Sequence, residues 1–271
     1  MVAYLDSVKR ARIQVGSLWS SRVGMIAMPV LLLTGLAPAQ TNQDARTLLQ
    51  QIAAVSHSAK SWFGEGVIVH EVTGGGMHAQ DESRFKVAYQ SPLRMLWETT
   101  AIKETVGEGQ TAPRTDQSGS SGTRIICDGN DHWTYNWPGS SFYHSSAAVS
   151  NCKPEIGDFS KIADNLLSAT VVGSDQVLFG NATKECELLR AEYITPTAQQ
   201  SKSATAHSVR TLCVDPAQKL VLRDRTERTD PSGVAVVETT TYGNYQRDAD
   251  LPADLFQFQV PTGYFEDDGP Q

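Results

Sequence analysis

Four cysteines are the residues whose type and spacing most directly suggest covalent chemistry, and they lie at positions 127, 152, 186 and 213. Zinc sites commonly contain closely spaced pairs such as C-x-x-C, which this sequence lacks, so disulfide bonds are favoured over a zinc site. Four cysteines allow three pairings. Sequence order favours Cys127 with Cys152 and Cys186 with Cys213, because the second pair lies on two strand-like runs separated by a polar loop.

Catalytic motifs give no comparable signal. The six histidines form neither H-x-x-x-H nor H-E-x-x-H, and the G-S-S-G sequence at 119–122 is not the G-x-S-x-G elbow of a hydrolase. The adjacent pairs His70-Glu71 and Asp131-His132 point to opposite faces of a strand, so neither can act alone as a catalytic dyad. No glycine-rich phosphate loop is present. We therefore expect a protein that is not an enzyme and binds no metal or cofactor.

An aromatic row follows a predicted turn in the sequence Arg124–Trp137. Asp128-Gly129 favours a tight reversal, and the strand beyond it would place Trp133, Tyr135 and Trp137 on one face. Aromatic side chains on one face of a strand usually fill a core. They can also line a cavity, and the row by itself leaves both interpretations open.

The first residues have the features of a secretory signal peptide. Four basic residues precede an apolar run of 14 residues, Val23 to Leu36, and Ala37-Pro38-Ala39 matches a small-x-small cleavage pattern. A membrane anchor is the alternative, but a bilayer span needs about 20 apolar residues. We expect cleavage after Ala39, with 1–39 as the signal peptide, 40–271 as one exported domain, and no stable membrane anchor. An exported chain meets an oxidising compartment, which agrees with disulfide formation.

The charge of the predicted mature chain restricts its partners. Four of the 23 basic and one of the 30 acidic residues lie in 1–39, which leaves a net charge of −10 on 40–271. Nucleic acids and anionic membrane surfaces are bound by basic patches. We therefore expect neither as a partner.

The periodicity of the remaining sequence predicts an α+β fold. Apolar residues at helical spacing indicate two amphipathic helices, over Thr41–Lys60 and Asp158–Thr170. About ten strands are predicted with the helices between runs of strands, which favours one large curved antiparallel sheet over a parallel βαβ sheet. The predicted strands are Trp62–Val72, Arg84–Tyr89, Leu93–Thr99, the two arms of the Arg124–Trp137 hairpin, Asp175–Phe179, Lys184–Ile194, His207–Val214, Leu220–Arg228 and Val234–Tyr245.

Three short motifs carry a resemblance to a known family. S-P-L-R-M-L-W-E begins at Ser91, I-I-C-D-G-N-D-H-W-T-Y-N-W-P begins at Ile125, and F-Q-F-Q-V-P-T-G begins at Phe256. In this order and spacing the sequence resembles the LolA/LolB superfamily of periplasmic lipoprotein carriers and its outer-membrane lipoprotein-sorting relatives. The resemblance covers essentially all of 40–271. It implies an incomplete antiparallel β-barrel, closed by helices, whose hydrophobic cavity receives acyl chains.

The resemblance also implies which residues form the site. Positions expected to face the cavity are Leu93, Met95, Trp97, Trp133 and Tyr135. Together with Trp137 and the apolar face of the preceding strand, Phe85, Val87 and Tyr89, these residues make up the predicted lipid-binding cavity. The second helix would act as a lid through Phe159, Ile162, Leu166 and Leu167.

The function expected from this resemblance is non-catalytic. A periplasmic monomer would bind the acyl chain of a lipid or lipoprotein by reversible burial, as a carrier or chaperone in envelope lipoprotein or lipid transport. The alternative is an envelope sensor or interaction domain that detects lipoprotein and engages a protein partner.

Overall fold

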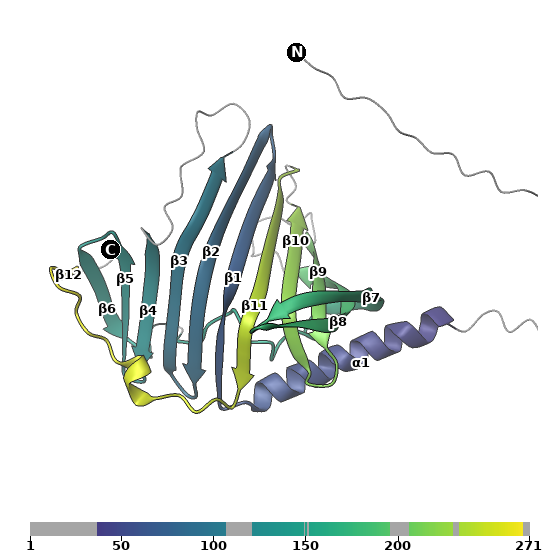
Figure 1. Cartoon of the computed structure of the whole chain (residues 1–271), viewed down its shortest axis with the longest axis horizontal. Coiled ribbons are helices and arrows are strands. Elements are labelled where there is room, and N and C mark those ends of the chain that lie inside the picture. Colours follow the sequence, from purple (N-terminus) through teal and green to yellow (C-terminus); the bar gives the residue numbers. More distant parts are fainter. Residues whose placement is uncertain are drawn as a thin grey trace, which may run out of the picture. The chain divides into compact units, whose positions relative to one another are not determined.

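The computed structural model describes residues 37–106, 121–148, 150, 152–195, 206–229 and 233–267. These residues form twelve strands of one open sheet, one α-helix and one short 3-10 helix (Figure 1). The predicted signal peptide lies outside the described residues, except for its last three positions, at which the helix begins. No helix in the described part of the chain is long and apolar enough to span a membrane.

The described helices and strands have the following bounds along the chain. In order they are α1 (Ala37–Ser58), β1 (Ser61–Gly74), β2 (Met77–Gln90), β3 (Arg94–Val106), β4 (Gly122–Asp128), β5 (Asp131–Trp137), β6 (Ser141–Ser146), β7 (Leu166–Phe179), β8 (Ala182–Thr195), β9 (Ala206–Asp215), β10 (Leu220–Thr229), β11 (Ala235–Arg247), η1 (Ala253–Phe256) and β12 (Phe265–Asp267).

Strand β1 lies near the middle of the sheet and separates its two halves. The strand order is β12-β6-β5-β4-β3-β2-β1-β11-β10-β9-β8-β7, so β2 to β6 extend to one side of β1 and β11 to β7 extend to the other. Neighbouring strands are antiparallel except β12, which pairs parallel with β6. This meander of long hairpins confirms the predicted large antiparallel sheet, although the described residues form more strands than the ten expected.

Strand registers decide which side chains share a face. We call one side the crossing face, because 152–165 (the crossing segment) cover it, and the other the tail face, because 251–264 (the C-terminal tail) cover it. Directly paired residues lie on the same face of a sheet. One row on the crossing face is Gly64, Val87, Trp97, Ile125 and Thr134, and one row on the tail face is Phe63, Ala88, Leu96, Ile126 and Trp133.

The main hydrophobic core joins α1 to the sheet. Leu49 and Ile52 of α1 are fully buried against a cluster that includes Leu189 of β8, Leu212 of β9 and Leu222 of β10. Arg46 of α1 also donates a hydrogen bond of 2.9 Å to the Leu167 carbonyl of β7. The prediction of an amphipathic helix that needs an apolar partner is therefore confirmed for Thr41–Lys60, and the helix begins earlier and ends two residues before the predicted boundary.

The second predicted helix is wrong. Residues 160–165 form turns and β7 begins at Leu166, so no helix covers Asp158–Thr170. The apolar residues of this stretch do have helical spacing. Gly157 and Asn165 adopt positive φ angles of 86° and 55°, however, and extended pairing of β7 with β8 takes the residues from Leu166 onward. In its described part the protein is therefore mainly β, with one α-helix rather than two covering helices.

Both predicted disulfides are confirmed. Cys127 in β4 bonds to Cys152, with 6.0 Å between their Cα atoms. Cys186 in β8 bonds to Cys213 in the adjacent strand β9, with 5.4 Å between Cα atoms. The first bond ties the start of the crossing segment to the sheet, and the second staples two neighbouring strands.

Candidate functional site

The crossing segment lies over the crossing face and is fastened to it along its length. Cys152 anchors its start through the bond to Cys127. The Tyr245 hydroxyl donates a hydrogen bond of 2.9 Å to the Gly157 carbonyl, and the Tyr193 hydroxyl donates one of 2.8 Å to the Ile162 carbonyl. Both tyrosines belong to strands of the sheet, so the sheet itself satisfies carbonyls of this irregular segment.

Gly157 of the crossing segment lies very close to the sheet. A Cβ atom placed on Gly157 would lie 2.5 Å from Cζ3 of Trp62, and the φ angle of Gly157 is +86°. Carbon atoms cannot approach so closely, and a positive φ is unfavourable for residues with a Cβ. Glycine at this position therefore allows the segment to rest directly on the Trp62 indole.

Asp158 stabilises the turn that follows Gly157. Its carboxylate forms an ion pair of 2.7 Å with Lys153 and accepts a hydrogen bond of 3.0 Å from the Ser160 amide. Burial raises the pKa of this carboxyl, but the hydrogen bonds from Lys153 and Ser160 outweigh burial and hold the pKa below its ordinary value. Asp158 is therefore ionised across the neutral range and supports the conformation of the segment.

An apolar pocket of about 350 Å³ lies where the crossing segment passes β3 and β4. Its floor consists of side chains from the crossing face of these two strands, and its wall comes from the start of the crossing segment. Because most of these groups are apolar, the pocket suits hydrocarbon rather than a polar solute. The residues that line it are Met95, Trp97, Ile125, Lys153, Pro154, Glu155 and Ile156.

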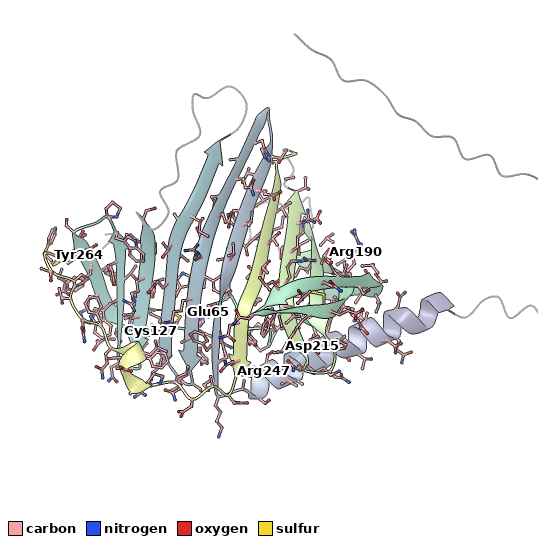
Figure 2. All side chains as sticks on the ribbon, viewed as in Figure 1. Glu65, Cys127, Arg190, Asp215, Arg247 and Tyr264 are labelled. Carbon is pink, nitrogen blue, oxygen red and sulfur yellow. A yellow bond between two sulfur atoms is a disulfide. The ribbon has the colours of Figure 1, made fainter. Side chains whose placement is uncertain are left out.

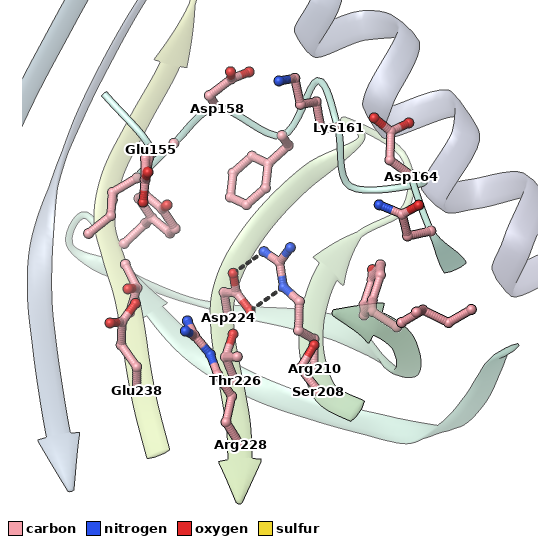
Figure 3. Close-up of a pocket in the computed structure, with 18 residues that line it drawn as sticks. Glu155, Asp158, Lys161, Asp164, Ser208, Arg210, Asp224, Thr226, Arg228 and Glu238 are labelled. Carbon is pink, nitrogen blue, oxygen red and sulfur yellow. Dashed lines mark hydrogen bonds and ion pairs between the residues drawn. The ribbon is translucent and has the colours of Figure 1, made fainter. Parts of the chain in front are cut away.

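A polar pocket of about 370 Å³ lies further along the same segment, over β8 to β11 (Figure 3). At its base Arg210 of β9 and Asp224 of β10 form an ion pair in which Nε of Arg210 lies 3.1 Å from Oδ1 of Asp224. Burial disfavours the charge on Arg210, but Asp224 outweighs this and raises the pKa of Arg210 above its ordinary value. This pair is therefore a permanently charged part of the pocket floor.

Further ionisable groups of the polar pocket are two buried tyrosines and a glutamate that pairs with a histidine. Burial raises the pKa of Tyr193 to about 12 and raises that of Tyr242 well above its ordinary value, so both phenols stay neutral at physiological pH. Glu238 of β11 pairs with His70 of β1 at 2.7 Å. In the described ranges no three histidine, cysteine, aspartate or glutamate side chains come together as a metal site.

The structure places the nine residues predicted to line one cavity in different environments and on both faces of the sheet. Met95 and Trp97 do line the apolar pocket, and Leu93 packs on the small cluster around Met95 and the Cys127–Cys152 bond. Phe85, Val87 and Tyr89 lie on the same face but are buried in the main core. Whether Met95 and Trp97 contact an acyl chain stays a prediction.

The aromatic row of β5 lies on the opposite face. Ile126 pairs with Trp133 and Cys127 pairs with His132, which directs Trp133, Tyr135 and Trp137 to the tail face. There Phe258 of the C-terminal tail stacks on Trp133 with 5.3 Å between ring centroids, and Tyr135 contacts both Phe258 and Tyr264. The prediction that this row shares a cavity with Met95 and Trp97 is therefore wrong.

The C-terminal tail extends this aromatic packing along the tail face. Phe256 is 1% exposed within a cluster formed with Ala88, Leu96 and Ile126. Tyr264 lies at the end of the sheet that carries β12 (Figure 2), and its hydroxyl donates a hydrogen bond of 3.2 Å to the Asn136 carbonyl. The tail thus occupies the surface on which the aromatic row was expected to receive a ligand.

The four predicted lid residues also belong to two different parts of the structure. Phe159 and Ile162 are buried under the crossing segment, where the Phe159 ring packs edge-on against Tyr242 at 5.9 Å. Leu166 and Leu167 belong to β7 instead, and Leu167 is 43% exposed. A cover over the crossing face is present, but it is an irregular segment held by the sheet and not a helix.

Several residues that line the two pockets were not identified from the sequence. Pro154 and Ile156 lie in a serine-rich irregular stretch without apolar periodicity. Ile125 could have been found, because it alternates with Cys127 and therefore shares its face. Arg210 and Asp224 come from different predicted strands, and their pairing follows only from the register of β9 and β10.

Comparison with known proteins finds matches among solved structures but none by sequence. No family model matches the sequence, and no curated protein matches it. A DUF1329 family protein from Desulfovibrio piger matches with a TM-score of 0.32 and 10% identity, covering 80% of this chain and 97% of that one. The MucA/MucB complex of Pseudomonas aeruginosa contains a chain that matches with a TM-score of 0.36 and 15% identity, covering 80% of this chain and 61% of that one.

A third match is a domain described as an outer-membrane lipoprotein-sorting protein, from Vibrio parahaemolyticus. Its TM-score is 0.31 at 10% identity, and the match covers 79% of this chain and 96% of that domain.

Proposed function

We propose that this protein is an exported, non-catalytic binding protein that holds the acyl chain of a lipid or lipoprotein in the apolar pocket beneath the crossing segment. The observation that carries the proposal is the pocket itself. Met95, Trp97 and Ile125 form an apolar floor, and Pro154 and Ile156 form an apolar wall above it. Contacts of this kind bind hydrocarbon without specific polar recognition.

The size of the pocket agrees with one chain. A volume of about 350 Å³ lies at the lower end of the range for small-molecule sites. Burying about eight to ten methylenes would contribute about 6 to 8 kcal/mol before the cost of association is subtracted. We therefore expect a dissociation constant at or above about 1 µM, which suits reversible binding.

The crossing segment supplies a means of loading. It has no regular secondary structure between residues 152 and 165, and its disulfide and its two hydrogen bonds from sheet tyrosines are separate anchors at Cys152, Gly157 and Ile162. In our proposal the stretch between the first two anchors moves away from β3 and β4 to admit the chain. The disulfide keeps the start of the segment attached to the sheet during this movement.

Export belongs to the same proposal. The two disulfides fit an oxidising compartment such as the periplasm, and the predicted cleavage after Ala39 would release 40–271 as the mature protein. A carrier and a sensor would share this pocket. They differ in whether the acyl chain passes to an acceptor or changes the affinity for a protein partner.

Titration with cis-parinaric acid tests the proposal, because the fluorescence of this fatty acid rises in apolar surroundings. Binding should saturate, and Ile125→Gln should weaken it about tenfold because an amide replaces an apolar floor group. Leu178→Gln is the matched control, since Leu178 is an apolar strand residue that is 65% exposed on β7. Equal affinities of the two variants, or no saturable binding by the native protein, would refute the proposed site. If the native protein binds the fatty acid, its transfer from the protein to vesicles would identify a carrier.

A further inference from the structure

The apolar pocket has one closed end, which we call the blind end. There the crossing segment and the sheet are joined covalently, because Cys152 of the segment bonds to Cys127 of β4. Both cysteines are 0% exposed, and they pack with Ala147 and with Met95, which pairs with Cys127 in the register of β3 and β4 and is 4% exposed. Met95 also lines the pocket. Hydrocarbon in the pocket therefore meets the packed Met95 side chain at this end and cannot pass between the segment and the sheet.

Packed side chains also bound the pocket on the side toward β2. Trp97 stacks on Phe85 with 6.1 Å between ring centroids, and Phe85 is buried in the main core. Further along the crossing segment, Gly157 rests on Trp62. Trp62 and Met95 belong to one row across the sheet, through the pairing of β1 with β2 and of β2 with β3. The segment thus meets the sheet on both sides of the pocket along this row, at the disulfide and at Gly157.

The opposite end of the pocket has a polar border. The residues that follow the pocket floor on the crossing face of β3 and β4 are Thr99 and Thr123, which pair with each other. Both are partly exposed, and the Thr123 hydroxyl donates a hydrogen bond of 2.7 Å to Oδ1 of Asn136. Hydrocarbon that extends over this border gains little from burial, because it stays in contact with water and with polar groups.

We propose that the blind end sets the length of acyl chain that the pocket binds, with Met95 as the residue that determines this length. The inference rests on the proposed function, because it concerns the same pocket and the same acyl ligand. The acyl chain lies along β3 with its methyl end against Met95. The other end of the acyl chain leaves the pocket over Thr99 and Thr123, so carbons beyond this border lie outside the pocket.

The volume of the pocket gives the expected limit. A methylene group takes up about as much space as a water molecule in the liquid, about 30 Å³. A pocket of about 350 Å³ therefore holds about ten carbons when part of the space stays unfilled. Below this limit each added methylene is buried and strengthens binding about two- to fourfold. Above the limit each added methylene stays in water and changes the affinity by less than about 1.5-fold.

A series of saturated fatty acids from about six to about sixteen carbons tests the inference, each as a competitor of cis-parinaric acid at concentrations below its own aggregation. For the native protein we expect the affinity to rise with length up to about ten carbons and then to level off. The length at which it levels off is the measured quantity, because a pocket without a closed end would give a continuous rise.

A pair of variants in β3 tests the role of Met95. Met95→Ala removes side-chain atoms that line the pocket, so the limit should move up by about two carbons. Leu96→Ala is the matched control, because Leu96 is the next residue of the same strand, is 0% exposed and loses the same number of heavy atoms, but packs on the tail face with Phe256. This control should leave the limit unchanged. Met95→Val and Leu96→Val remove less and repeat the comparison at a smaller cost in stability, and circular dichroism checks that each variant is folded.

The outcomes separate this inference from the proposed function. An affinity of the native protein that rises steadily to the longest fatty acid would overturn the length limit while leaving acyl binding in place. A limit that moves equally in the Met95 and Leu96 variants, or in neither, would overturn the assignment of Met95. Absence of competition by every fatty acid, together with no saturable binding of cis-parinaric acid, would refute the proposed function and the inference with it.

Discussion

Replacing Gly157 by alanine should destabilise the protein more than its small size suggests. The added Cβ would lie 2.5 Å from Cζ3 of Trp62, whose side chain is buried, so either the indole or the crossing segment must move. Overpacking of this kind costs about 1 to 3 kcal/mol, and forcing a residue with a Cβ into a positive φ costs about 1 to 2 kcal/mol more. We expect the free energy of unfolding of Gly157→Ala to fall by about 2 to 5 kcal/mol.

Gly263→Ala separates these two contributions. Gly263 has a φ of +85°, almost equal to the +86° of Gly157, but a Cβ at Gly263 would meet no atom within 4 Å. This control should therefore lose only the backbone contribution of about 1 to 2 kcal/mol. Urea unfolding of both variants, followed by tryptophan fluorescence and by far-ultraviolet circular dichroism, measures the difference. Equal losses of stability would show that the crossing segment does not rest on Trp62 as described.

Two further predictions concern the anchors of the crossing segment. Replacing Cys152 and its partner by serine, or Cys186 and its partner, should lower stability by about 3 kcal/mol in each case because the closed loops have sequence separations of 25 and 27. In acyl titrations only the variant that lacks the Cys127–Cys152 bond should lose affinity. Equal affinities of the two variants would contradict the role of that bond in anchoring the crossing segment. Because the pKa of Asp158 is lowered by folding, its contribution to stability is present above the unfolded value and is lost as pH falls through the folded value, below about pH 4. Asp158→Asn should therefore weaken the pH dependence of unfolding in that acid range, and an unchanged acid profile would refute this assignment.

Local sequence patterns were sufficient for much of the fold. Alternating apolar residues indicated most long strands, and the helical spacing of Leu48, Leu49 and Ile52 indicated α1, because each pattern reflects burial of one side of a regular element. The disulfide pairing followed from order along the chain. Two short strands at one end of the sheet, β6 and β12, were not predicted, since neither has a distinctive alternation of buried and exposed residues.

The error in the second helix has a different cause. Phe159, Ile162 and Leu166 are spaced as in a helix, and each is wholly or partly buried, but turns and the start of a strand bury them instead. Helical spacing in the sequence indicates which residues are buried. It does not determine the backbone conformation of the segment that contains them. Tertiary contacts, here the hydrogen bonds from Tyr193 and Tyr245, determine the conformation.

The site was predicted only in part because it depends on register. Within β5 the sequence correctly places Trp133 and Tyr135 on one face, and within β3 it places Met95 and Trp97 on one face. Relating the two strands requires the register of β3 against β4, and shifting a register by one residue exchanges the faces. The chain between β3 and β4 is too long for the sequence to specify that register, so the two apolar sets were joined when they lie on opposite faces.

Photo-crosslinking with a fatty acid that carries a diazirine near the end of its chain tests the central claim most directly. After irradiation and digestion, mass spectrometry identifies the residues that touch the chain. Acyl binding beneath the crossing segment predicts adducts on Trp97, Ile125 and residues 153–156, which line one pocket. Adducts confined to the tail face, on Trp133 or Phe258, or no adduct that excess unlabelled fatty acid can compete away, would contradict it.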